Sequence, residues 1–248
     1  MGKEVVTLEE IAPGVAQITM ADKAGKNTFT QDLIDGLQDC FARLCEPRYK
    51  VAILTGYENY FACGGTKEEL ISFHRGELTF DQLSFYRIAL DCEIPVIAAM
   101  QGHAIGGGFV LGLYADMVVL GWENIYTANF MRYGFTPGLG ATLIVPARLG
   151  EPLGQELLFT GHNYRGEELA RRGIPYPVVP KKQVLERAQT MAQSLAEKPR
   201  LSLTLLKRHF AGPLRQRLSE FVQHELRMHE ATFKQPEVEK RIHALFGN

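Results

Sequence analysis

The sequence predicts an α/β fold built on parallel strands, and three observations support this prediction. Short apolar runs alternate with segments of helical periodicity over residues 1–183. Two of these runs, residues 51–56 and 94–100, are almost entirely apolar, which is typical of strands buried on both faces. From residue 184 onward the pattern changes to nearly continuous helix. We therefore expect a core over residues 1–183 and a helical region over residues 184–248.

The first elements are a hairpin and a helix. Residues 5–11 and 15–20 are strand-like runs separated by a Pro-Gly pair, which favours a turn. Residues 29–44 place apolar side chains three or four positions apart, so they are expected to form an amphipathic helix that stops near Pro47.

The middle of the chain continues the alternation. Residues 60–70 combine a strand end, small residues and a helix start. Residues 71–79 are expected to be of mixed character, with a mobile turn at residues 75–77. Short strands are expected at residues 117–120 and 125–128.

A loop over residues 129–137 then leads into a helix that ends at Leu149, and two short helices follow at residues 153–159 and 167–172. In the helical region, prolines are expected to mark the boundaries between helices. Pro199 and Pro213 divide the region, and Pro236 ends the last long helix.

Composition limits the class of protein. The 248 residues carry a formal net charge of −1, with a pI near 6.7, so no global field attracts nucleic acid or an anionic membrane. No apolar run approaches the ~20 residues that span a bilayer, and we expect a soluble, cytoplasmic protein. The cysteines form no Cys-x-x-Cys pair and are expected to be free, buried thiols in a reducing compartment. They are Cys40, Cys45, Cys63 and Cys92.

Three consecutive glycines, Gly106, Gly107 and Gly108, open a predicted buried helix just after the strand at residues 94–100. Each costs about 1 kcal/mol relative to alanine in a helix, so a benefit other than helix stability is expected. Either the glycines permit close helix packing, or they let a ligand approach the backbone, where unpaired N–H groups favour negative charge. The stretch itself leaves both explanations open.

Residues 60–70 form a second glycine-rich corner of the same kind. Two such corners can each present a backbone N–H to the same carbonyl oxygen. Such a pair of donors is an oxyanion hole, which suits the enolates of thioesters. An anion-binding pocket is the alternative. The chain lacks the serine-hydrolase, phosphate-loop and dinucleotide-binding motifs. His224 and His229 are five residues apart, about 140° around a helix, so no metal site is expected.

Several runs together resemble the crotonase (enoyl-CoA hydratase/isomerase) superfamily. They are AAMQGHAIGGG at residues 98–108, YFACGG at residues 60–65 and GFTPG at residues 134–138. The resemblance covers essentially the whole chain. It implies a crotonase-like spiral of ββα units, a C-terminal helical region that covers the active site, and a homotrimer or a dimer of trimers. By position, it makes Gly65 and Gly107 the two oxyanion donors.

The departures from the family pattern concern proton transfer. Hydratases of the family use two glutamates to handle water, and the matching positions here hold Val110 and Phe130. Neither side chain can transfer a proton, so an ordinary hydratase is not expected. The two residues are expected to form an apolar wall of the substrate site.

Three longer runs resemble one branch, the decarboxylating crotonase-like enzymes of polyketide β-branching (HMG-synthase) cassettes. They are LDCEIPVIAAMQGH at residues 90–103, YTANFMRYGFTPG at residues 126–138 and MHEATF at residues 228–233. The resemblance implies loss of CO2 from a 3-methylglutaconyl group carried on the phosphopantetheine of an acyl carrier protein. It implies no other cofactor. A C-terminal histidine is catalytic in that branch, and His229 holds the matching position.

Some members of that branch use a lysine after the first corner, and here Lys67 or Arg75 could take its place, although Lys67 is also interpreted as a solvated lysine at a helix start. Asn129 and Tyr133 of the loop are interpreted as substrate-binding residues or as hydrogen-bonded structural groups. For His229, the other interpretation is a packed, hydrogen-bonded core residue, and His103 is expected to support the backbone. A group of basic residues in the C-terminal helices is interpreted as a solvated face or as a surface for an acidic carrier protein. It comprises Arg200, Lys207, Arg208, Arg215 and Arg217.

Two other functions stay open from the sequence. One is a crotonase-fold isomerase or dehydratase acting on CoA thioesters, which needs a new proton-transfer group. The other is a catalytically silent thioester-binding protein, which the missing glutamates favour and the two retained glycine corners oppose.

Overall fold

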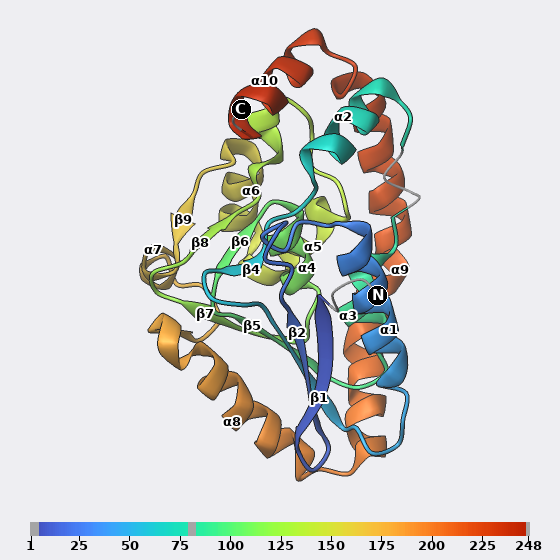
Figure 1. Ribbon diagram of the computed structural model, residues 1–248, viewed down its shortest axis with the longest axis vertical. Helices are drawn as coiled ribbons and strands as arrows, with labels where there is room; N and C mark the ends of the chain where they lie inside the picture. Colours follow the sequence, from blue (N-terminus) through green and yellow to red (C-terminus); the bar gives the residue numbers. More distant parts are fainter. Residues whose placement is uncertain (1–4, 79–82, 247–248) are drawn as a thin grey trace.

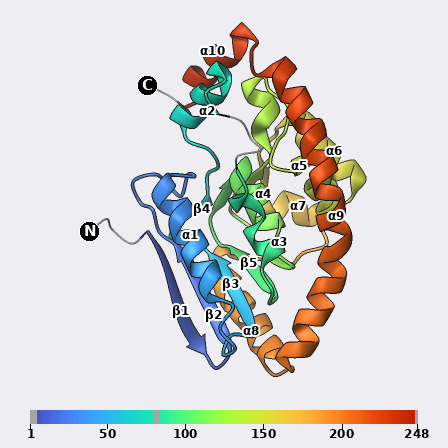
Figure 2. The same cartoon turned by 90° about the vertical axis from the view of Figure 1, so that its right-hand side faces the viewer.

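The computed structural model describes residues 5–78 and 83–246, in which strands form two sheets (Figures 1 and 2). The larger sheet has the order β1-β2-β3-β5-β7-β10, with one antiparallel pair, β1 and β2, at its edge. Its strands are Val6–Ala12, Val15–Met20, Val51–Thr55, Val96–Met100, Met117–Gly121 and Val178–Val179. The smaller sheet has the order β4-β6-β8-β9. Its strands are Tyr60–Ala62, His103–Ile105, Ile125–Thr127 and Tyr164–Arg165.

A repeating ββα unit connects the two sheets. In each repeat the first strand joins the larger sheet, the second joins the smaller one, and a helix follows. The repeats are β3-β4-α2 (Lys67–Arg75), β5-β6-α4 (Gly107–Leu113), and β7-β8 with η3 (Asn129–Tyr133) and α5 (Ala141–Leu149). This confirms the expected crotonase-like spiral. Because β4, β6 and β8 are parallel neighbours, the chain leaves all three at the same edge of the small sheet.

The larger sheet is buried on both faces, as its apolar runs predict. Val51 and Ile53 pack with Val184 and Ala188 of helix α8 (Val184–Ala196), which covers one face. The intervening Ala52 and Leu54 point into the main core on the other face, where helix α1 (Gln31–Arg43) lies. This alternation follows from the two-residue period of a strand.

Helix α9 (Arg200–Thr232) runs the length of the molecule beside the core (Figure 2). Contrary to the prediction, Pro213 lies inside it, and the helix continues through that position. A proline inside a helix costs about 3 kcal/mol, which the packing of Ala211 and Leu218 on either side offsets. The boundary predicted at Pro236 is confirmed, because α9 ends at Thr232 and Pro236 begins helix α10 (Pro236–Phe246), where its missing N–H is not needed.

The predicted solvated basic face is wrong for Lys207. Its side chain is buried, with Nζ 2.8 Å from Asp116 Oδ2 and hydrogen-bonded to the carbonyl oxygens of Ala89 and Ile94. The pair attaches the first half of α9 to the start of strand β7. Removing one partner of a buried ion pair typically costs 3–5 kcal/mol, so Lys207 is a structural tether.

Residues 71–75 continue helix α2 instead of having mixed character, and the helix ends at Gly76 in the left-handed conformation. The turn is therefore confirmed, and its mobility stays a prediction. Thr79 lies outside the described residues. Several short elements lack a clear sequence pattern and were not predicted, among them β6, β9 and β10. Other helices are η2 (Phe85–Arg87), α3 (Ile88–Asp91), α6 (Glu151–Thr160), α7 (Gly166–Arg171) and η4 (Lys181–Gln183).

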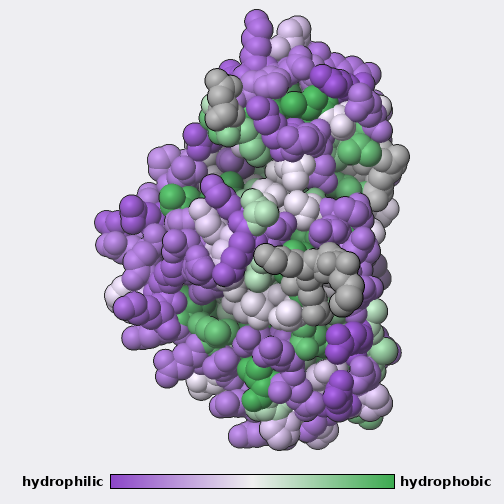
Figure 3. Space-filling model, in the orientation of Figure 1, coloured by the Kyte–Doolittle hydropathy of each residue, from purple (hydrophilic) through white to green (hydrophobic). Residues whose placement is uncertain are grey.

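The surface shown in Figure 3 is mostly hydrophilic, with hydrophobic side chains in small separate patches. Among the described residues, no helix combines the length and apolar character needed to cross a bilayer. None of the four cysteines, all of them among the described residues, forms a disulfide, and Cys45 is exposed, contrary to the expected burial. Trp122, at the end of β7, donates its indole N–H to the carbonyl of Val178 in β10. The division into two domains after residue 183 stays a prediction. Helix α8, which follows this boundary, shares a core with the larger sheet.

Candidate active site

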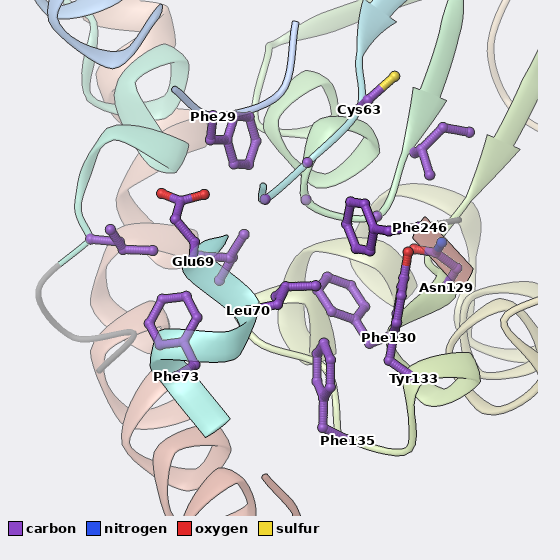
Figure 4. A pocket seen from close by; sticks show the side chains of 17 residues that line it. Phe29, Cys63, Glu69, Leu70, Phe73, Asn129, Phe130, Tyr133, Phe135 and Phe246 are labelled. Atoms are coloured by element: carbon purple, nitrogen blue, oxygen red, sulfur yellow. The ribbon is translucent and has the colours of Figure 1, made fainter. Parts of the chain in front are cut away.

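A pocket of about 570 Å³, including its open mouth, lies where the smaller sheet meets helices α2, α4 and α10 (Figure 4). Its walls are mainly apolar and aromatic. The lining residues are Phe29, Cys63, Gly64, Gly65, Glu69, Leu70, Phe73, Leu83, Ile105, Gly106, Gly107, Asn129, Phe130, Tyr133, Phe135, Leu139 and Phe246.

The first glycine corner connects β4 to α2. Gly64 has a φ of +75°, and its carbonyl accepts the Phe29 N–H at 2.8 Å. Thr66 caps the helix, since its hydroxyl accepts the Glu69 N–H while the Glu69 carboxylate accepts the Thr66 N–H. This capping box fixes the start of α2 and leaves Gly65 at the pocket wall.

The second corner connects β6 to α4 and uses its three glycines differently. Gly106 has φ +55° and ψ −123°, a conformation open to glycine. A Cβ added to Gly107 would lie 2.7 Å from the Phe29 ring, and one added to Gly108 would lie 2.1 Å from the Ala62 carbonyl oxygen. Close packing and an open backbone therefore both account for the triplet.

The two corners meet at the pocket. A Cβ added to Gly64 would lie 3.1 Å from the Gly107 nitrogen, so the first corner passes directly beside the second. Over residues 5–78 and 83–246, no protein acceptor pairs with the N–H of Gly65 or of Gly107. Two neighbouring main-chain donors without protein partners at an apolar pocket are the chemical elements of an oxyanion hole.

Helix η3 and the loop that joins it to α5 form the opposite wall. Asn129, Phe130 and Tyr133 line the pocket, as predicted for a substrate site, and burial raises the pKa of the Tyr133 phenol. Leu139 also lines it, in a left-handed conformation with φ +63° that is strained for leucine. The Tyr114 hydroxyl donates to the Leu139 carbonyl at 2.8 Å and holds this turn.

Helix α9 holds the same loop from outside through two polar residues one turn apart. The Glu225 carboxylate accepts hydrogen bonds from the Gly140 N–H, the Thr142 N–H and the Thr142 hydroxyl at 2.6–2.8 Å. Burial raises the pKa of Glu225 to about 7, although these hydrogen bonds favour its charged form. The sequence reading missed Glu225, since a single glutamate on a helix carries no local signal.

His229 lies outside the pocket lining. Its Nε2 is 2.9 Å from the Thr136 carbonyl oxygen and 3.0 Å from that of Pro137. Because both partners are acceptors, Nε2 carries the proton and donates it to them. Burial lowers the pKa of the imidazole. The placement favours the second interpretation of His229, a packed residue that holds the loop.

Two further predicted site residues are not at the pocket. Val110 is fully buried in the core, because only the first turn of α4 reaches the pocket. Lys67 begins α2, but the side of that helix facing the pocket is formed by Glu69, Leu70 and Phe73. Arg75 lies 3.9 Å from Glu239 of α10. His103 supports the backbone as expected, since its Nδ1 accepts the Ile125 N–H.

The pocket also contains residues that sequence reasoning did not assign to it. The Thr-x-x-Glu pattern of residues 66–69 is a capping-box signature and could have placed Glu69 at the first turn of α2. No local signal points to Phe246 of α10, whose ring centroid lies 5.7 Å from that of Tyr133. Among the described residues, no cluster of three or more His, Cys, Asp or Glu side chains is arranged to hold a metal.

A spiral of ββα units with two backbone donors at an apolar pocket defines a crotonase-type protein. The chain belongs to the enoyl-CoA hydratase/isomerase family, whose profile matches residues 10–246. This confirms the family predicted from its glycine motifs.

Closer relatives are decarboxylases by name. The bacillaene synthase decarboxylase PksI of Bacillus subtilis is 53% identical over the full length of both chains. A solved structure from a dehydratase/decarboxylase enzyme couple of polyketide β-branching matches 98% of this chain and 100% of its own, with 54% identity and a TM-score of 0.96. The ECH2 decarboxylase domain of CurF from Lyngbya majuscula has 49% identity and a TM-score of 0.93, with 97% and 98% covered.

Proposed function

We propose that this chain is a decarboxylase of polyketide β-branching, acting on a 3-methylglutaconyl group carried by an acyl carrier protein and giving a 3-methylcrotonyl-type thioester. The observation that carries the proposal is the pair of unpaired amides at Gly65 and Gly107 beside an apolar pocket. The full-length identity of 53% to a named decarboxylase supports the reaction type.

The reaction needs a site for developing charge more than it needs a base. When the bond to the carboxylate breaks, its electrons pass through the double bond to the thioester carbonyl and form a dienolate. The N–H groups of Gly65 and Gly107 would hold the dienolate oxygen. Loss of one such donor typically raises the barrier by about 2.7–4 kcal/mol.

The apolar walls serve the leaving group. Phe130, Phe135 and Phe246 line the pocket, so a substrate carboxylate placed among them loses its water. Carbon dioxide is neutral, so the same apolar surroundings stabilise it relative to the carboxylate. His229 acts here through the loop that it holds, at Thr136 and Pro137.

The finer parts of the proposal come from the family resemblance. The substrate reaches the pocket on the phosphopantetheine arm of the carrier protein, with no other cofactor. The compartment is the cytoplasm, and the assembly is a homotrimer or a dimer of trimers. Arg208 and Arg217 remain exposed on α9 and are available to an acidic partner.

A second candidate is an isomerase or dehydratase of CoA thioesters. One observation favours it: Glu69 places a carboxylate in the pocket, and such enzymes need a proton-transfer group. A decarboxylase releases carbon dioxide from the substrate, a dehydratase releases water, and an isomerase releases nothing.

The test is the mass of the acyl group on its carrier protein after incubation with the purified chain. Loss of the mass of carbon dioxide is expected. Loss of the mass of water supports the dehydratase. An unchanged mass supports the isomerase if the double bond has moved, and a silent binding protein if the acyl group is bound but unaltered. Any of these results overturns the decarboxylase.

A matched pair of variants tests the oxyanion hole. Gly107→Pro removes the N–H at the first position of α4, where a helix tolerates proline, and Gly107→Ala adds the same Cβ against Phe29 while keeping the N–H. We expect turnover of the proline variant to be about 100-fold below that of the alanine variant. Equal turnover would exclude the Gly107 amide as a donor.

A further inference from the structure

Glu69 places a carboxylate in the wall of the proposed reaction site. Within the part of the chain that the structure describes, it is the one acidic side chain lining the pocket. A Cβ added to Gly65 would lie 3.6 Å from Glu69 Oε2, so the carboxylate sits beside one oxyanion donor. Figure 4 shows it directed into the cavity between Phe29 and Leu70.

The two oxygens of Glu69 have different surroundings. Oε2 accepts the Thr66 N–H at 2.8 Å and the Thr66 hydroxyl at 3.2 Å, which fixes the side chain. No described residue donates a hydrogen bond to Oε1. The capping role accounts for Oε2 and leaves Oε1 available to a molecule in the pocket.

The surroundings favour the protonated acid. Burial raises the pKa of Glu69, and Glu68 raises it further, against the effect of the hydrogen bonds from Thr66. A substrate with its own carboxylate adds a second negative charge nearby, which raises the pKa of Glu69 again. Both effects shift Glu69 toward the protonated form that a proton donor requires.

We propose that Glu69 is the acid that protonates the dienolate after carbon dioxide leaves, an inference that rests on the proposed decarboxylase function. The bond between the substrate carbon and its carboxylate breaks, and its electrons form the dienolate. The Oε1–H bond then breaks, its proton bonds to the dienolate carbon, and the oxyanion electrons restore the thioester carbonyl. Glu69 takes a proton from water before the next turnover.

The other titratable groups near the pocket are weaker acids or face elsewhere. Burial raises the pKa of Cys63 to about 11 and also raises that of Tyr133. His229 donates to two carbonyl oxygens outside the pocket lining. The charged groups at the far end of α2 pair with helix α10. They are His74 and Arg75, which both face Glu239.

Glu69→Gln is the informative variant, because glutamine at this position keeps the capping box but cannot donate a carboxylic proton. We expect its turnover to fall about 100-fold. In the wild type, turnover should fall as pH rises through the raised pKa of Glu69, because the acid loses its proton. The turnover of the Glu69→Gln variant should not show this fall. Glu77→Gln, at an exposed position beyond the same helix, is the control and should keep the wild-type profile.

The measurements are carbon dioxide release and the position of the double bond in the product, over a pH series, with thermal unfolding of each variant as a check of folding. The inference would be overturned if the Glu69→Gln variant kept the turnover, the pH profile and the product isomer of the wild type. A wild-type rate that does not fall with rising pH would also overturn it, whether or not the variant folds. If the wild type releases no carbon dioxide, the decarboxylase proposal itself fails.

Discussion

The two corners that meet at the pocket present similar amides but are built from different forces. The corner from β4 to α2 is held by polar side chains, the Thr66 hydroxyl and the Glu69 carboxylate. The corner from β6 to α4 has no side-chain cap, and every residue of α4 is buried. Packing therefore positions Gly107, whereas hydrogen bonds position Gly65. A corner fixed by packing tolerates no added atoms, and one fixed by hydrogen bonds tolerates volume but not the loss of a polar group.

The largest effect is expected from volume added to the packed corner. In Gly108→Ala the new Cβ would lie 2.1 Å from the Ala62 carbonyl oxygen, which is backbone and cannot move aside. We expect the free energy of unfolding, measured with urea, to fall by more than about 3 kcal/mol. Gly65→Ala is the matched variant at the polar corner, where the nearest atom would be 3.6 Å away. Equal stabilities of the two variants would remove the distinction between the corners.

A smaller effect concerns the support of the packed corner by α9. Leu139 contacts the Gly107 position, and Glu225 holds the next residue, Gly140. The pKa of Glu225 is about 7 in the folded protein, against an ordinary 4.5, so the folded state binds more protons between these values. Its protonation therefore stabilises the fold below about pH 4.5, and this contribution is lost as pH rises through 7.

The size of this contribution is about 3 kcal/mol, from about 1.4 kcal/mol for each tenfold change in proton affinity. Urea unfolding at pH 5 and pH 8 measures it. We expect the wild type to lose more stability between these values than Glu225→Gln, which cannot titrate. Parallel losses in the two proteins would show that Glu225 does not titrate there.

The smallest effect is expected at the polar corner. Thr66→Ala removes the cap of α2, and the free energy of unfolding should fall by about 1 kcal/mol. Thr66→Ser retains a hydroxyl and should stay near the wild type. The stability of both variants is measured by the lowering of the thermal midpoint of unfolding. A loss in the alanine variant as large as that of Gly108→Ala would contradict the contrast between hydrogen bonding and packing.

The sequence revealed the parts of the site that depend on backbone. Glycines at Gly65 and Gly106–Gly108, each after an apolar strand, were enough to place both corners, because such patterns have a local physical cause. The parts that depend on tertiary contacts were not visible. Pro213 indicated a helix end that packing overrides, and Val110 follows the family pattern but is enclosed by the core. Phe246 reaches the pocket only through the fold of α10.

The position of the single tryptophan has an optical consequence. Trp122 is 46% exposed and hydrogen-bonded across the seam between β7 and β10, away from the residues that line the pocket. Its intrinsic fluorescence therefore reports fraying of that sheet edge and is insensitive to acyl groups entering the cavity. The substitution Phe246→Trp would instead place an indole beside the Tyr133 ring and give titrations of bound thioester a fluorescence signal.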